Sequence, residues 1–286
     1  MIPSAQEWTQ SPQKRALLFG MSGLGKTHVS NMLRASGEWF HYSIDYRIGT
    51  RYMGEFIVDN FKAHALQDPF LAELLRSDSI YIASNLTFEN LDPLSTYLGK
   101  PGNPELGGLP IEEYMRRQKQ HHIAEVSALL DTPYFIKRAL ELYGYQNFIC
   151  DSGGSICEVV DPWNPDDEVL KTLSGETLMI WIEGSEEHTQ ALIDRFNRSP
   201  KPMCYQSSFL LPFWTEYLEE RDIDGSKVDP NDFIRAAYRR ALTARQPRYR
   251  AMAENWGVSV PASEIARLKT PQDFEDLVRQ TLENRA

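Results

Sequence analysis

The sequence lacks the features that mark secreted and membrane proteins. Its 286 residues include only three cysteines, Cys150, Cys157 and Cys204, and no CxxC pair. An odd number of cysteines without a dense framework indicates free thiols in a reducing compartment. No run of about 18 apolar residues occurs, so no transmembrane helix is expected. The first fifteen residues are polar, and no apolar stretch typical of a signal peptide follows them. We therefore expect a cytoplasmic protein without a membrane partner.

An excess of basic residues is also lacking. The chain has 30 lysines and arginines against 40 acidic residues, which gives a formal net charge of −10. Proteins that bind nucleic acid usually show a basic excess, so this balance argues against a nucleic-acid partner. The composition, 42% hydrophobic and 24% charged, is that of a globular protein. It leaves the oligomeric state open.

The periodicity of apolar residues predicts an α/β fold. A short apolar strand over 16–19 is followed by a glycine-rich turn, a helix over 26–35 and a second strand over 39–43. This βαβ unit implies parallel strands, because parallel strands need a crossover of such length. Further strands are predicted over 147–150, 178–182 and 258–260. A final helix is predicted from Pro271, with Thr270 as its N-cap.

The turn between the first strand and its helix carries the strongest motif. It matches the pattern GxxxxGK[ST] in full with Gly20, Met21, Ser22, Gly23, Leu24, Gly25, Lys26 and Thr27. Glycines let the backbone curl so that its N–H groups face a phosphate, and the helix N-terminus favours an anion. Lys26 is expected to reach the β- and γ-phosphates, and Thr27 to bind Mg²⁺. The motif predicts an ATP–Mg²⁺ site; no NKxD segment supports GTP instead.

The residues after the second strand resemble the shikimate kinase family of P-loop small-molecule kinases. In that family a DxD pair follows the P-loop, and its second aspartate contacts the substrate hydroxyl as the candidate base. Asp45 stands at the same separation, since 45 minus 26 gives 19 residues after Lys26, whereas Ser43 replaces the first aspartate. The resemblance implies a three-layer α/β/α P-loop fold with a central parallel sheet and helical insertions. It also implies Lys26 and Asp45 as catalytic residues.

A second segment, residues 148–154, resembles the apolar strand and glycine-rich turn beside the substrate in that family. The resemblance implies that Gly153 and Gly154 border the substrate. Asp151 ends the apolar run as an acid ends a Walker B strand, and could supply the metal contact for which Ser43 is a poor ligand. Alternatively, Asp151 caps its turn through its side chain. The sequence leaves both interpretations open.

Three basic residues complete the resemblance. Arg195 lies where the family has an arginine beside the adenine, and Lys201, followed by proline, replaces the arginine of the lid. Each could equally be a solvated charge. Arg245 begins a segment that resembles the R-x-P-L-Y helix, in which the arginine holds the substrate carboxylate. Six arginines between residues 235 and 250 favour an anionic acceptor, although such a run is usually a charged helix face.

The resemblance covers only part of the chain. We predict a polar tail over 1–14 and a single kinase-like domain over 15–286. Its insertions are predicted at about 52–146, on the substrate side, and at 203–232, in the lid. The proline-rich segment 85–110 is predicted to be an ordered loop or a lid. The histidines at 121 and 122 are predicted on the surface, because adjacent helical residues point to different faces and make a poor metal pair.

Two functions follow from these patterns. The first is an ATP-dependent kinase that transfers the γ-phosphate to a hydroxyl of an anionic small molecule. The second is an ATP-binding or ATP-hydrolysing switch that acts on a protein or nucleic acid. The kinase would gain support if Asp45, Gly153 and Arg245 shared one cleft, and the switch if residues 209–217 exposed a large aromatic patch.

Overall fold

The computed structural model describes residues 2–285, which divide into two compact units. The sheet unit contains the chain up to Ile44, Val126–Pro200 and the chain from Arg235 onward. The helical unit contains Asp45–Glu125 and Lys201–Ile234. The helical unit overlaps the insertions expected at 52–146 and 203–232, and the assignment of one kinase-like domain stays a prediction.

The sheet unit is built on five parallel strands in the order β2-β3-β1-β4-β5. Their bounds are β1 Arg15–Phe19, β2 Trp39–Ser43, β3 Asn147–Asp151, β4 Leu178–Glu183 and β5 Gly257–Pro261. Each of the predicted strands is present, and most are extended by one or two residues. The central strands are continuous apolar runs because helices cover both sheet faces; Ala16 to Phe19 of β1 are fully buried. The sheet unit has the three-layer α/β/α architecture of P-loop proteins, as predicted.

Helices flank the strands of the sheet unit. They are α1 Ala5–Gln10, α2 Lys26–Ala35, α8 Thr132–Glu141, α9 Ile156–Val159, α10 Glu168–Glu176, α11 Glu186–Arg198, α14 Ala262–Ile265 and α15 Pro271–Arg285. The helix α2 contacts β2 and β3, and so does α8. Two longer helices, α7 Ile111–Leu130 and α13 Pro230–Trp256, each contain a boundary between the units.

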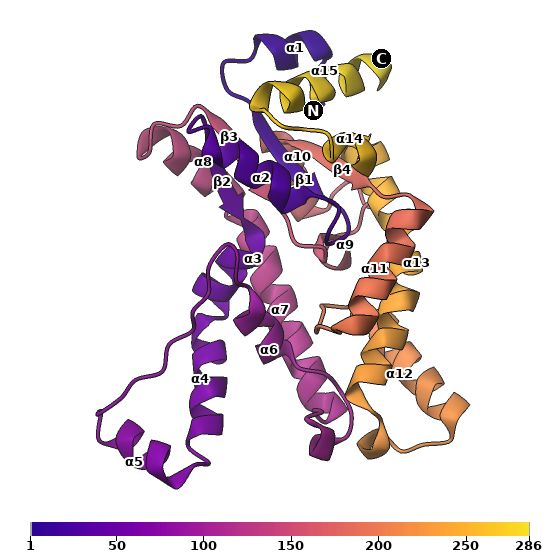
Figure 1. Cartoon of the computed structure of the whole chain (residues 1–286). Helices are drawn as coiled ribbons and strands as arrows, with labels where there is room; N and C mark the ends of the chain where they lie inside the picture. Colours follow the sequence, from indigo (N-terminus) through magenta and orange to yellow (C-terminus); the bar gives the residue numbers. More distant parts are fainter. Residues whose placement is uncertain (1, 286) are drawn as a thin grey trace. The chain divides into compact units, whose positions relative to one another are not determined.

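The segment predicted as a polar tail contains a helix. Ser4 accepts a hydrogen bond from Glu7 N, and the Glu7 carboxylate accepts one from Ser4 N, which forms a capping box at the start of α1. Trp8 is buried, and α1 lies beside α15 (Figure 1). The single tryptophan anchors this otherwise polar segment, which is too short for a clear helical periodicity.

The helical unit consists of short helices joined by ordered loops. Its elements are α3 Ile44–Arg47, the π-helix η1 Ile48–Tyr52, α4 Gly54–Ala65, α5 Pro69–Arg76, α6 Asp92–Leu98, the 3₁₀ helix η2 Pro104–Leu106, α12 Ser207–Arg221 and the 3₁₀ helix η3 Gly225–Lys227. The predicted loop 85–110 therefore contains α6 and η2. Backbone hydrogen bonds such as Gly108 N to Asn103 O, 2.8 Å, order its second half.

The aromatic residues of α12 form part of the core of the helical unit. Trp214 and Tyr217 are buried, and their rings lie edge-on to Phe233 at centroid distances of 4.8 and 5.2 Å. Phe213 packs against the same ring at 5.6 Å. An aromatic patch for a protein partner is therefore not formed by these side chains. Within residues 2–285, no helix is both long and apolar enough to cross a membrane.

The surface position predicted for His121 is wrong. Its side chain is 4% exposed, whereas the adjacent His122 lies on the exposed side of α7. Adjacent residues do point to different faces, as predicted, but one of these faces is covered by the segment that contains Cys204. Gln118, one turn before His121, receives a hydrogen bond from Tyr205 N at 2.9 Å. The covering segment lies far from α7 in the sequence, so its contact could not be read from the helix alone.

Candidate functional site

The P-loop joins β1 to α2 and depends on its glycines. Gly20, Gly23 and Gly25 have φ angles of +127°, +91° and +105°, a region that other residues rarely adopt. A Cβ atom on Gly20 would also lie 2.9 Å from the carbonyl oxygen of Ile182 on β4. The loop conformation therefore requires glycine both for its backbone angles and for its close approach to the neighbouring strand.

The ammonium group of Lys26 lies inside this loop. Its Nζ donates hydrogen bonds to Gly20 O at 2.8 Å and to Met21 O at 3.1 Å, and the residue is 6% exposed. Lys26 is the first residue of α2, so its charge adds to the positive end of the helix dipole. The loop thus concentrates positive charge and N–H donors where a bound phosphate would need them.

Thr27 and Asp151 connect the P-loop to the neighbouring strand β3. Thr27 Oγ1 donates to Asp151 Oδ2 at 2.9 Å. The contact arises because β1 and β3 are parallel, with Leu18 paired to Asp151, so their carboxyl ends meet at one edge. Burial raises the pKa of Asp151, opposed by the charge of Lys26 and by the hydrogen bond from Thr27. A hydroxyl and a carboxylate side by side are the oxygen ligands that Mg²⁺ prefers.

The strand β2 brings two more polar residues to this edge. Ser43 is paired with Asp151 in the sheet register. His41, two residues earlier and thus on the same face of β2, has its Nε2 4.0 Å from Asp151 Oδ2. Burial, followed by the charge of Arg34, lowers the pKa of His41 to about 4, so its imidazole is neutral at pH 7. His41 belongs to no motif in the sequence, although its two-residue spacing from Ser43 places both side chains on one face of β2.

The glycine-rich turn after β3 packs directly against the P-loop. A Cβ atom on Gly154 would lie 2.8 Å from Ser22 Oγ and 3.2 Å from Ser22 N. The carbonyl of Gly154 accepts hydrogen bonds from Arg245 Nη1 at 3.2 Å and from the Tyr249 hydroxyl at 2.5 Å. The turn that contains Gly153 and Gly154 therefore lies between the P-loop and α13, and only a residue without a side chain fits at its second position.

Arg245 reaches this turn but also has an internal carboxylate partner. Its Nε donates to Glu158 Oε1 at 2.6 Å, and the two side chains are 3% and 6% exposed. The predicted grip of Arg245 on a substrate carboxylate remains a prediction, and any acceptor would share the guanidinium with Glu158. Glu158 could not be predicted from the sequence, because it lies 87 residues from Arg245 and no local pattern connects the two.

Arg195, on α11, also contacts the P-loop. Its Nη2 donates to Ser22 O at 3.4 Å, and a Cβ atom on Gly23 would lie 2.3 Å from the same nitrogen. This contact places the guanidinium on the P-loop, and the predicted position of Arg195 beside the adenine stays a prediction. Lys26 and Arg195 thus place two cationic groups on the P-loop, an arrangement that suits a polyphosphate.

Asp45 and Lys201 belong to the helical unit. Asp45 lies in the first turn of α3, directly after β2. Lys201 Nζ donates to Asp92 Oδ1 at 2.6 Å, and both side chains are more than half exposed. The contact predicted for Asp45 with the acceptor hydroxyl and the contact predicted for Lys201 with the nucleotide stay predictions.

Comparison with known proteins found similarity among solved structures. No protein-family model and no curated protein sequence matches the chain. Among solved structures, the chain is similar to shikimate kinase from Bacteroides thetaiotaomicron, with 14% sequence identity and a TM-score of 0.39. The similarity covers 96% of this chain and 98% of the other.

Proposed function

We propose that the chain is an ATP-dependent phosphotransferase of the small-molecule kinase type. The observation that carries the proposal is the contact of Thr27 with Asp151, 2.9 Å, beside a P-loop that already holds the Lys26 ammonium. A glycine-rich turn without a ligand would need neither a buried lysine on its own carbonyls nor an acid on the next strand. Burying such charged groups costs free energy unless they are paired or serve a ligand.

The residues of the sheet unit fit a magnesium nucleotide. The P-loop N–H groups and Lys26 would hold the β- and γ-phosphates, and Arg195 would cover the loop from the side of Ser22. Thr27 and Asp151 would be the protein ligands of Mg²⁺. The bound ion would neutralise charge that develops on the phosphate oxygens during transfer.

The reaction would move the γ-phosphoryl group to an acceptor hydroxyl. The bond between the γ-phosphorus and the bridging oxygen of ADP breaks as the acceptor oxygen forms its bond to phosphorus. Asp45 would orient the hydroxyl and receive its proton, as the resemblance to shikimate kinases implies. Lys201 would close over the phosphates and exclude water, which would otherwise accept the phosphoryl group.

The acceptor is proposed to carry a carboxylate or phosphate besides its hydroxyl. Arg245 and the turn of Gly153 and Gly154 would contact it, and a guanidinium recognises planar anions through paired hydrogen bonds. An anion that binds Arg245 would share the guanidinium with Glu158 and with the carbonyl of Gly154. The same Glu158 would repel an acceptor with a second negative charge close to the first.

The proposal is tested by incubation of the chain with γ-labelled ATP, Mg²⁺ and a fractionated metabolite pool. Label is expected in a small anionic product, and Lys26→Met should abolish its formation. Release of label only as inorganic phosphate would instead favour the ATP-hydrolysing switch. No binding of ATP by the wild-type chain would overturn both functions.

A further inference from the structure

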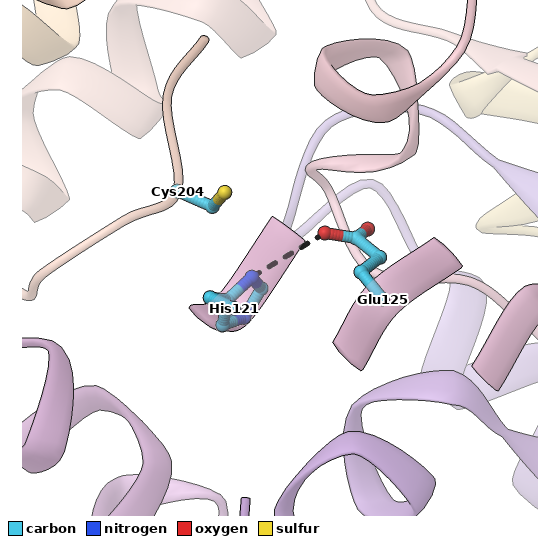
Figure 2. Close-up of side chains that lie close together, drawn as sticks. All are labelled: His121, Glu125 and Cys204. Carbon is cyan, nitrogen blue, oxygen red and sulfur yellow. Dashed lines mark ion pairs between the residues drawn. The ribbon is translucent and has the colours of Figure 1, made fainter. Parts of the chain in front are cut away.

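A cluster of three metal-binding side chains lies in the helical unit, outside the site described above. His121 and Glu125 are one turn apart on α7, and Cys204 comes from the segment that precedes α12 (Figure 2). One donor atom from each residue lies within 4.8 Å of the others. His121 Nδ1 and Glu125 Oε2 are 3.5 Å apart. An imidazole, a carboxylate and a thiol therefore converge on one point.

All three side chains are withdrawn from solvent, and one ring nitrogen of the cluster lacks a hydrogen bond among residues 2–285. His121 and Cys204 are each 4% exposed, and Glu125 is fully buried. Within the described part of the chain, His121 Nδ1 has no hydrogen-bond partner, and its 3.5 Å separation from Glu125 is too long for a strong one. Burial lowers the pKa of His121 to about 4, which keeps the imidazole neutral at pH 7. Its nitrogen lone pair is then available to a metal ion.

The backbone around Cys204 is fixed from both sides by one residue of α7. Gln118 Nε2 donates to Met203 O at 3.1 Å, and Tyr205 N donates to Gln118 Oε1 at 2.9 Å. Gln118 is itself buried and lies one turn before His121. This paired contact sets the height of Cys204 along α7, so the thiol is held opposite His121 and Glu125. Sites whose ligands are positioned by such neighbours bind metals more tightly than flexible ones.

We infer that His121, Glu125 and Cys204 bind one zinc ion. A thiolate disfavours Mg²⁺ and Ca²⁺, and a mixed set of sulfur, nitrogen and oxygen donors suits the borderline-soft Zn²⁺. Zinc bonds of about 2.0 Å to nitrogen and oxygen and about 2.3 Å to sulfur place tetrahedral ligands about 3.3 to 3.6 Å apart. Rotation of the side chains would bring the three donor atoms, which now lie within 4.8 Å of one another, to these distances. Binding releases the Cys204 thiol proton to solvent, and water fills the fourth position.

The zinc ion would join the two chain segments of the helical unit. Glu125 ends the first segment, Asp45–Glu125, and Cys204 lies near the start of the second, Lys201–Ile234. The two residues are 79 positions apart, since 204 minus 125 gives 79. An ion that binds only the folded arrangement stabilises it by mass action. The ion would therefore stabilise the helical unit, and its ligands are different residues from the proposed magnesium ligands Thr27 and Asp151.

The test uses the full chain without an affinity tag, stripped of metal by a chelator. Titration with Co²⁺ is expected to give one equivalent of a tetrahedral complex with a thiolate-to-cobalt charge-transfer band in the near ultraviolet. Zn²⁺ should displace the cobalt, and competition with a chromophoric chelator gives its affinity. Cys204→Ser should remove the band and weaken zinc binding more than about 100-fold, beyond the loss typical of an outer-shell change. His121→Ala should also weaken it.

Two control variants separate this site from metal binding elsewhere on the chain. His122→Ala removes the exposed neighbouring imidazole, and Asp151→Asn removes the proposed magnesium ligand; neither should change zinc affinity. X-ray absorption at the zinc edge of the wild-type chain does not depend on the folding of any variant, and should show one sulfur among nitrogen and oxygen ligands. The inference would be overturned by any of three results. These are a zinc coordination shell without sulfur, a charge-transfer band that survives in Cys204→Ser, and the lack of stoichiometric metal binding by the wild-type chain.

Discussion

The hydroxyl of Thr27 donates to the carboxylate of Asp151 across 2.9 Å, although 124 residues separate them in the chain. The parallel pairing of β1 with β3 produces this contact, because it places the end of each strand at the same edge of the sheet. The contact supports the interpretation of Asp151 as a metal ligand beside Thr27, which stays a prediction.

Asp151→Asn should raise the Mg²⁺ concentration needed for ATP binding, because an amide oxygen is a weaker ligand than a carboxylate. The amide can still accept the hydrogen bond from Thr27, so stability should change little. Calorimetric titration of ATP at several Mg²⁺ concentrations measures the effect. The exposed variant Asp166→Asn serves as the control. Identical magnesium dependence in Asp151→Asn and wild type would mean that Asp151 does not hold the ion.

Lys26→Met should weaken ATP binding at least about tenfold, since it removes charge-assisted hydrogen bonds to the phosphates. Methionine keeps the length of the side chain and so preserves most of the packing of the loop. Isothermal titration calorimetry gives the dissociation constant, and circular dichroism checks the fold. The exposed Lys171→Met is the matched control. Unchanged affinity in Lys26→Met would remove the central claim about the P-loop.

The buried pair of Arg245 and Glu158 predicts a large loss of stability when one partner alone is removed. Glu158→Gln should lower the free energy of unfolding by about 3 kcal/mol, because it leaves a buried guanidinium without its counter-charge. The double variant Glu158→Leu with Arg245→Met should recover part of this loss. Urea unfolding measures both. If the double variant loses as much stability as Glu158→Leu alone and Arg245→Met alone lose together, the two charges are not coupled.

Local patterns in the sequence predicted the strands, the P-loop and the position of Asp151 at the end of an apolar strand. Each of these features depends on residues that are close together in the chain. The sequence could not predict that Glu158 pairs with Arg245, since only the packing of α13 beside the turn after β3 brings them together. His121 shows the same limit. His121 lies in a helix of regular periodicity, but the burial of its side chain depends on a segment that lies more than 80 residues later in the chain.

Two buried histidines predict that stability falls on acidification. Burial lowers the pKa of His41 and of His121 to about 4 from an ordinary value of 6.5. Between pH 6.5 and 4 the unfolded chain binds protons that the folded chain does not, so the free energy of unfolding decreases as pH falls through this window. Urea unfolding of the metal-free chain at several pH values measures the slope. His41→Gln should reduce the slope, whereas the exposed His122→Gln should leave it nearly unchanged.

The contact of Gly154 with Ser22 gives the sharpest steric test of the site. Gly154 does not have a left-handed φ, so an alanine there would be strained only by space, with its Cβ 2.8 Å from Ser22 Oγ and 3.2 Å from Ser22 N. Gly154→Ala should therefore displace the P-loop and weaken ATP binding. Gly175→Ala, on α10 with no described atom within 4 Å of its Cβ, should have no such effect.

A second substitution identifies which contact causes the loss. Ser22→Gly removes the hydroxyl that meets the new Cβ, but keeps the backbone N–H at 3.2 Å. If the hydroxyl is the obstacle, the double variant Gly154→Ala with Ser22→Gly should bind ATP nearly as well as Ser22→Gly alone. If the backbone is the obstacle, the double variant should stay weak. Normal ATP affinity in Gly154→Ala itself would show that the turn does not constrain the P-loop.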